Sequence, residues 1–215
     1  EPKTSAKNFG FKAKGYGSMI LNMNYLYQIS NAKNFRYEFA QKRVLNENDQ
    51  QFRNDSADKY DIFLSHSYMD KELVCAVVDL FNSAGYSIYI DWMNDQQLNR
   101  SEVTATTADI LRKRMRMSKG LAYIATGNSS NSKWCPWELG YADAAKNGRC
   151  AILPIMKKEG ESFKGQEYLG LYPFIDYETK KGTHEYEFWV NDPENGNYIS
   201  LREWLSGENP CNHSE

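Results

Sequence analysis

Short apolar runs that alternate with helical patterns constrain the fold of this chain more than any other feature. Strands joined by helices form a parallel sheet with helices on both faces. We therefore predict an α/β fold with a five-stranded parallel sheet, whose last strand lies at an edge. The five predicted strands are Tyr60–Ser65, Ser87–Asp91, Leu121–Ala125, Cys150–Ile155 and Tyr172–Asp176.

The segment after the first run shows how clear the helical pattern is. Apolar residues recur at the helical spacing i, i+3, i+4 and i+7. Ser67 with an acid three residues later is a typical helix start, and Gly85 suits the position just after a helix end. The apolar positions are Val74, Val77, Val78 and Phe81.

The length and composition divide the chain into three parts. Its 215 residues suit one domain of about 120 to 150 residues with appendages. We predict an N-terminal extension and linker over 1–57, the α/β domain over 58–180, and a C-terminal extension over 181–215. The C-terminal extension carries a predicted hairpin and a short helix, which we expect to pack on the α/β domain.

Charge, histidines and cysteines narrow the classes of function. Residues 1–57 hold 9 basic and 5 acidic side chains, a net charge of +4 that is too sparse for a nucleic-acid surface. The four cysteines form no CxxC pair, and the three histidines lack zinc-ligand spacing. We therefore expect a cytoplasmic protein with no metal site, no cofactor, no membrane segment and no nucleic-acid partner.

The candidate site lies at the carboxyl ends of the predicted strands, where open parallel sheets bind ligands. Ser65 and His66 end the first strand, and Asp91 and Trp92 end the second. The loop 126–132 follows the third strand and leads into the next predicted helix. We expect these residues to lie together.

The stretch after that loop, Asn131–Tyr141, sets Trp134 and Glu138 four residues apart. Residues at this spacing share one face of a helix, and Pro136 suits a first helical turn. A glutamate there also has a structural explanation, because a carboxylate in the first turn stabilises the helix dipole. Structural roles are also open for the other residues: His66 can cap the helix that follows it, and Trp92 and Trp134 can pack in the core.

These motifs in this order resemble a family, the Toll/interleukin-1 receptor (TIR) domains, over about residues 60–176. The resemblance rests on YDIFLSHSYMD at the first strand, on the Trp92 loop, and on WCPWELGYA in the later helix. It implies a flavodoxin-like fold and is closest to the NAD-cleaving TIR proteins of bacterial antiphage defence, of the Thoeris type.

The resemblance also implies a reaction and its residues. NAD would be the substrate, Glu138 the catalytic residue, and the product a cyclic or modified ADP-ribose that activates a separate effector protein. TIR–TIR self-association is expected, with sites that a neighbouring protomer can complete. The implied substrate-binding residues are Ser65, His66, Asp91, Trp92 and Trp134.

One carboxylate suffices for this chemistry. Nicotinamide leaves as a neutral molecule from a cationic nitrogen, so no general acid is needed, and one carboxylate can stabilise the oxocarbenium-like transition state. Two alternatives remain from the sequence. The first is a non-enzymatic TIR scaffold, and the second is a flavodoxin-like phosphate binder, which the lack of a glycine-rich loop after the first strand disfavours.

Overall fold

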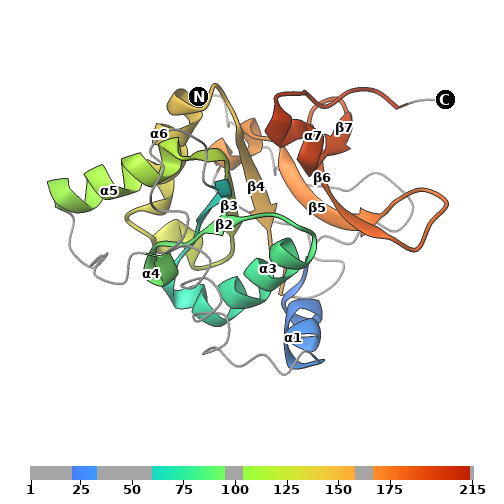
Figure 1. Ribbon diagram of the computed structural model, residues 1–215, viewed down its shortest axis with the longest axis horizontal. Coiled ribbons are helices and arrows are strands. Elements are labelled where there is room, and N and C mark those ends of the chain that lie inside the picture. The colour runs from blue at the N-terminus through green and yellow to red at the C-terminus, as the bar shows by residue number, and fades with distance from the viewer. Residues whose placement is uncertain (1–20, 33–59, 95–103, 158–166, 214–215) are drawn as a thin grey trace, which may run out of the picture.

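The computed structural model describes residues 21–32, 60–94, 104–157 and 167–213 (Figure 1). Their strands form one sheet in the order β2-β1-β3-β4-β5-β6-β7. The first five pair in parallel and the last two in antiparallel fashion. The strands are β1 (Tyr60–Ser65), β2 (Ile88–Tyr89), β3 (Ser118–Ala125), β4 (Cys150–Pro154), β5 (Phe174–Thr179), β6 (Tyr186–Asn191) and β7 (Tyr198–Ser200).

The helices join these strands and cover the sheet. The α-helices are α1 (Met23–Ala32), α3 (Lys71–Ser83), α4 (Asp91–Asn94), α5 (Ala105–Arg116), α6 (Cys135–Ala145) and α7 (Leu201–Ser206). Three short 3-10 helices are η1 (Tyr68–Asp70), η2 (Ser129–Asn131) and η3 (Glu167–Leu171). No helix in these four described ranges is long and apolar enough to cross a membrane.

The parallel part of the sheet agrees with the sequence prediction except at the second strand, where β2 spans only Ile88–Tyr89 and the predicted strand end Asp91 begins α4. Strand β1 has the predicted bounds, and β3 and β4 overlap their predicted runs. The predicted end of α3 is confirmed, whereas its predicted start at Ser67 belongs to η1 and α3 itself begins at Lys71. The Ser67 hydroxyl accepts the Met69 N–H in η1, which leads into α3, and Gly85 follows the helix at a φ of 82°.

The prediction of a purely parallel, five-stranded sheet was wrong. Strand β5 is not at an edge, because β6 pairs along its whole length from Phe174↔Asn191 to Thr179↔Tyr186. The predicted C-terminal hairpin exists, but it continues the sheet as β6 and β7. Residues 180–185 join β5 to β6, and their polar sequence does not indicate that these two strands pair. The pairing depends on backbone hydrogen bonds between the two strands, not on the sequence of the turn.

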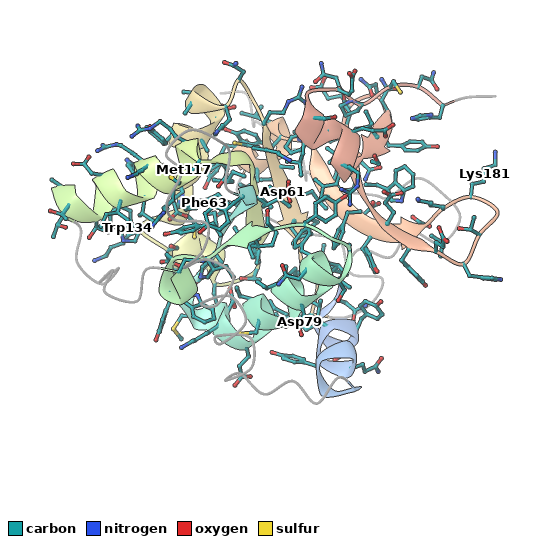
Figure 2. All side chains as sticks on the ribbon, in the orientation of Figure 1. Asp61, Phe63, Asp79, Met117, Trp134 and Lys181 are labelled. Carbon is teal, nitrogen blue, oxygen red and sulfur yellow. The ribbon has the colours of Figure 1, made fainter. Side chains whose placement is uncertain are left out.

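Helices on the two faces of the sheet enclose two hydrophobic cores. Figure 1 shows α1 and α3 on one side of the sheet and α5 and α6 on the other. The apolar face of α3 belongs to the first core, and the four residues predicted from its spacing are at most 3% exposed. Phe63 and Trp134, both labelled in Figure 2, belong to the second core.

Part of the predicted N-terminal extension is built into the fold. Residue Asn22 forms an isolated parallel bridge with Met156, just after β4. Leu21 and Leu26 are at most 1% exposed and pack in the first core, where α1 contacts α3. The segment 21–32 therefore completes the cover of one sheet face, whereas the rest of the predicted extension lies outside the described residues.

Candidate functional site

The site is built where β1 ends and α6 begins. The Ser65 hydroxyl, at the last residue of β1, donates a hydrogen bond of 2.6 Å to Glu138 Oε2. Helix α6 starts as its sequence indicates, with Pro136 in the first turn. The Ser132 hydroxyl accepts the backbone N–H groups of Trp134 and Cys135 at 3.3 Å. These two bonds hold the backbone just before Pro136, where the turn that carries Glu138 begins.

Glu138 is fully buried, and so is its partner. Both Glu138 and Ser65 have an exposed fraction of 0%. The carboxylate stands in the first turn of α6, at the positive end of the helix dipole. A buried carboxylate is costly unless hydrogen bonds and dipoles compensate it, and Ser65 and the helix supply both. The sequence argument brought these two residues to one edge of the sheet without predicting their contact.

His66 holds Trp92. The Trp92 indole N–H donates to His66 Nε2 at 2.7 Å, and the Nδ1 atom lies 2.8 Å from the Leu64 carbonyl oxygen. These partners assign a neutral ring with its proton on Nδ1. The Asp91 carboxylate lies 3.6 Å from Nε2, at the first residue of α4. His66 and Asp91 are at most 2% exposed, and Trp92 is half-buried.

Trp134 lies mainly in the protein core. Its exposed fraction is 5%, and its ring packs edge-on against Trp137 with 5.4 Å between centroids. The residue is the N-cap of α6, and its carbonyl accepts the Glu138 N–H at 2.8 Å. As the spacing predicts, both residues stand at the start of the same helix. Trp134 is also packed in the core, which is the alternative role that the sequence left open for it.

The sequence argument missed a second link between the loops at this edge. The Asp70 carboxylate accepts hydrogen bonds from Thr126 Oγ1 and Asn128 Nδ2, both at 2.6 Å. Asp70 lies in the loop that follows β1, and Thr126 and Asn128 lie in the loop that follows β3. The sequence pattern predicts for Asp70 only a role in a helix start; its position close after the end of β1 is the signal that could have pointed to this link.

A cleft formed by described residues lies elsewhere. It has a volume of about 410 Å³ and is lined by Gly148 and Arg149, which precede β4, together with parts of η3, α7 and the 192–194 turn. These positions lie at the amino ends of the parallel strands. The cleft is therefore on the opposite edge of the sheet from Glu138.

The grouping at the carboxyl edge can stabilise a positive charge. It combines a buried carboxylate held by a hydroxyl, a second buried acid in Asp91, and the indole ring of Trp92, over which the Lys71 ammonium lies 4.8 Å from the ring centroid. The described residues hold no group of three or more His, Cys, Asp or Glu side chains arranged around a metal. A cationic, ring-containing substrate suits these residues better than an anion.

Comparisons with known proteins agree with this architecture. The model of the TIR domain family matches residues 62–188. The chain is 40% identical over 188 residues to a protein of Bacillus cereus (strain MSX-D12) named as a probable 3′ cyclic ADP-D-ribose synthase, ThsB′. That alignment covers 86% of this chain and 94% of the relative.

Two further similar proteins align with a smaller part of this chain. A candidate cyclic ADP-D-ribose synthase, TIR2 of Cytobacillus dafuensis, is 39% identical over 84 residues, which are 39% of this chain and 22% of that protein. A solved metazoan TIR-STING receptor from C. gigas is 17% identical, with a TM-score of 0.36, over 47% of this chain and 32% of that one. The family match and the nearly full-length relative establish that this chain belongs to the TIR domain family.

Proposed function

We propose that this TIR protein cleaves the nicotinamide–ribose bond of NAD and closes the ADP-ribose part into a cyclic product. The observation that carries the proposal is the 40% identity to a protein named as a 3′ cyclic ADP-D-ribose synthase, across 94% of that protein. The Ser65–Glu138 pair adds a group able to perform the first step. The cyclic product would serve as a signal in antiphage defence.

In the proposed mechanism, Glu138 stabilises the positive charge that develops on the ribose. Nicotinamide departs with the electron pair of the C–N bond and becomes neutral, so no proton is transferred to it. A fixed carboxylate in a site shielded from water lowers the energy of the oxocarbenium-like transition state. The reaction as proposed needs neither a metal nor a cofactor.

NAD binding has to open the site. Glu138 is 0% exposed, so no ligand atom can reach its carboxylate in this conformation. Trp92 is half-buried and offers an aromatic face beside His66 and Asp91, and Trp134 starts the helix that carries Glu138. We propose that Trp92 and Trp134 line the opened pocket and exclude water, which favours capture of the cation within the same molecule.

Ser65 is proposed to orient the carboxylate. The Ser65→Ala variant should lower kcat for nicotinamide release about tenfold and change KM less than about threefold, because a hydrogen bond to a charged group contributes roughly 1.5–3 kcal/mol. Steady-state assays of nicotinamide release measure both constants. Ser200→Ala is the control, since the Ser200 hydroxyl donates to Glu203 Oε2 at the same 2.6 Å. An equal loss of kcat in the two variants would contradict this role.

The proposal includes two partners. We propose that TIR–TIR contacts complete or stabilise the active site, and that a separate effector protein senses the product. Tyr68 and Met69, 63% and 79% exposed, stand in η1 near the proposed site and offer apolar surface for such a contact. A cytoplasmic location would supply NAD, and the free thiols of the four cysteines suit it.

Chromatography of NAD incubated with the protein tests the proposed function. We expect nicotinamide and a cyclic ADP-ribose to form in equal amounts, at a rate per protein that rises with protein concentration if assembly completes the site. Linear ADP-ribose as the main product would assign a hydrolase instead. Intact NAD at every concentration, also after addition of lysate from phage-infected cells, would favour the non-enzymatic scaffold.

A further inference from the structure

Asp70 occupies a helix-cap position without capping the helix. It is the N-cap residue of α3, yet its side chain makes no cap hydrogen bond. An aspartate at this position normally accepts a backbone N–H of the first turn. Here both carboxylate oxygens turn to another loop, where Oδ2 accepts from Thr126 Oγ1 and Oδ1 from Asn128 Nδ2, each at 2.6 Å. The side chain thus joins Asp70 to two residues that lie 56 and 58 positions further along the chain.

The two bridged loops carry the two halves of the proposed site. One loop runs from Ser65 at the end of β1 through η1 to Asp70. The other runs from Thr126 after β3 through η2 to α6, which carries Glu138. The Ser65–Glu138 hydrogen bond joins the loops at one point, and Asp70 joins them at a second. Two attachments define the relative position of the loops better than one.

The second loop is internally bonded and can transmit this restraint. Thr126 Oγ1 also accepts the Asn128 N–H at 3.1 Å, and the Ser129 hydroxyl donates to the Thr126 carbonyl at 2.9 Å. The Ser129 carbonyl accepts the Ser132 N–H at 3.2 Å, and the Ser132 hydroxyl accepts the N–H groups of Trp134 and Cys135 at the start of α6. The bonds from Asp70 to Thr126 and Asn128 therefore reach the turn of Glu138 through an unbroken run of short-range contacts.

Burial strengthens the Asp70 link. Asp70 and Thr126 are 6% and 7% exposed, and Ser129 is 2% exposed. Hydrogen bonds to a carboxylate are short and strong, and they weaken less when water is excluded. The 2.6 Å distances agree with bonds of this kind.

We propose that Asp70 is a positioning residue for Glu138. Its carboxylate clamps the loop after β1 to the loop after β3 and thereby sets the distance between Ser65 and the Glu138 carboxylate. This inference rests on the proposed NAD cleavage. Displacing a reacting group by about 1 Å can lower a rate about 100-fold, so a loose clamp has a measurable kinetic effect.

Three variants of the clamp and one matched control test this role. Asp70→Ala removes both bonds, and Asp70→Asn keeps the shape. Thr126→Val keeps the side-chain volume but removes one bond to Asp70 together with the bond from the Asn128 N–H. The control is Asp61→Ala, because Asp61, labelled in Figure 2, also joins two segments of the sheet. Its carboxylate accepts from Ser87 and from Lys119 in β3, at the amino end of the strands.

Kinetic constants for nicotinamide release separate positioning from simple stabilisation. We expect kcat to fall about 10- to 100-fold in Asp70→Ala and several-fold in Thr126→Val, with KM within about threefold. Asp70→Asn should keep kcat within about fivefold, because the Asn128 amide can rotate and accept from the new amide. Asp61→Ala should keep kcat within about twofold although it lowers the melting temperature.

Two kinetic results would overturn the proposal. The first is a loss of kcat in Asp70→Ala no larger than in Asp61→Ala, which would leave Asp70 a purely stabilising role. The second is an Asp70→Asn variant as inactive as Asp70→Ala, which would assign the negative charge to the chemistry itself. Thr126→Val carries the test if Asp70→Ala does not fold.

Amide hydrogen exchange tests the clamp without relying on activity. Exchange over residues 126–138 should rise in Asp70→Ala and Thr126→Val and stay at the wild-type level in Asp61→Ala. Unchanged exchange in the clamp variants would contradict the clamp. A wild-type protein that never cleaves NAD would refute the proposed function, while the exchange experiment would still decide whether the clamp exists.

Discussion

Replacing Glu138 with glutamine is expected to lower kcat for nicotinamide release at least about 1000-fold. The change keeps the size of the side chain, and the Ser65 hydroxyl can still donate to its oxygen, so the fold is preserved. It removes the negative charge that stabilises the cationic transition state, an effect of about 4 kcal/mol or more. Chromatographic assays of NAD loss measure kcat, and calorimetry with NAD should give a Kd within about threefold of wild type.

The chain contains a matched control for this experiment. Glu203, in the first turn of α7, accepts a hydrogen bond from Ser200 at 2.6 Å, just as Glu138 accepts one from Ser65. Glu203→Gln removes the same charge from a similar pair outside the proposed site and should leave kcat within about twofold. Residual activity above about a tenth of wild type in Glu138→Gln would place the chemistry at another residue.

The second large effect concerns stability at a residue outside the site. Asp176 in β5 is 4% exposed, and burial raises its pKa to about 7. The nearby Glu178 carboxylate adds to the rise. The Oδ1 atom of Asp176 and the amide nitrogen of Asn191 are buried without a hydrogen-bond partner. Below about pH 7 the folded protein therefore favours the neutral, protonated form of Asp176.

The direction of the pH effect follows from this raised pKa. In the unfolded chain Asp176 ionises near its ordinary value of 3.8, so the unfolded state gains stability relative to the folded state as the pH rises from about 4 to about 7. The cost to the folded state is fully present above about pH 7. Asp176→Asn mimics the neutral form and should raise the free energy of unfolding by on the order of 3 kcal/mol at pH 8, and by little at pH 4.

Urea unfolding of wild type and Asp176→Asn between pH 4 and pH 8 measures this difference. Asp109→Asn is the control, because the Asp109 side chain is 73% exposed on α5 and should change stability only slightly at any pH. A difference between wild type and Asp176→Asn that does not grow with pH would show that Asp176 is ionised at little cost in the folded protein.

The parts of the fold that the sequence predicted are those governed by local patterns. The apolar runs of β1, β3 and β4 identify buried strands because both faces of a parallel sheet are covered. The start of α6 follows from Pro136, and the end of α3 from Gly85, because these residues suit the backbone there. The family motifs then pointed to Glu138 before any contact was known.

The contacts that define the site depend on residues far apart in the chain. The rule that ligands bind at the carboxyl ends of strands grouped Ser65, His66, Asp91 and Trp92 correctly at one edge. It could not show that Ser65 bonds to Glu138, 73 residues away, or that both His66 nitrogens already have partners. Such contacts depend on the packing of α6 against β1 and on the position of α4 beside His66.

The amino-acid sequence by itself determined the α/β class, the order of strands and helices along most of the chain, and the edge of the sheet at which the candidate site residues lie. Only the tertiary structure decided that β5 has a neighbour in β6, that Asp70 joins two loops instead of capping α3, and that Asp176 is buried. Hydrophobic periodicity is set by neighbours within a few residues. Strand pairing, buried hydrogen bonds and desolvation are set by whichever distant segments the fold brings together.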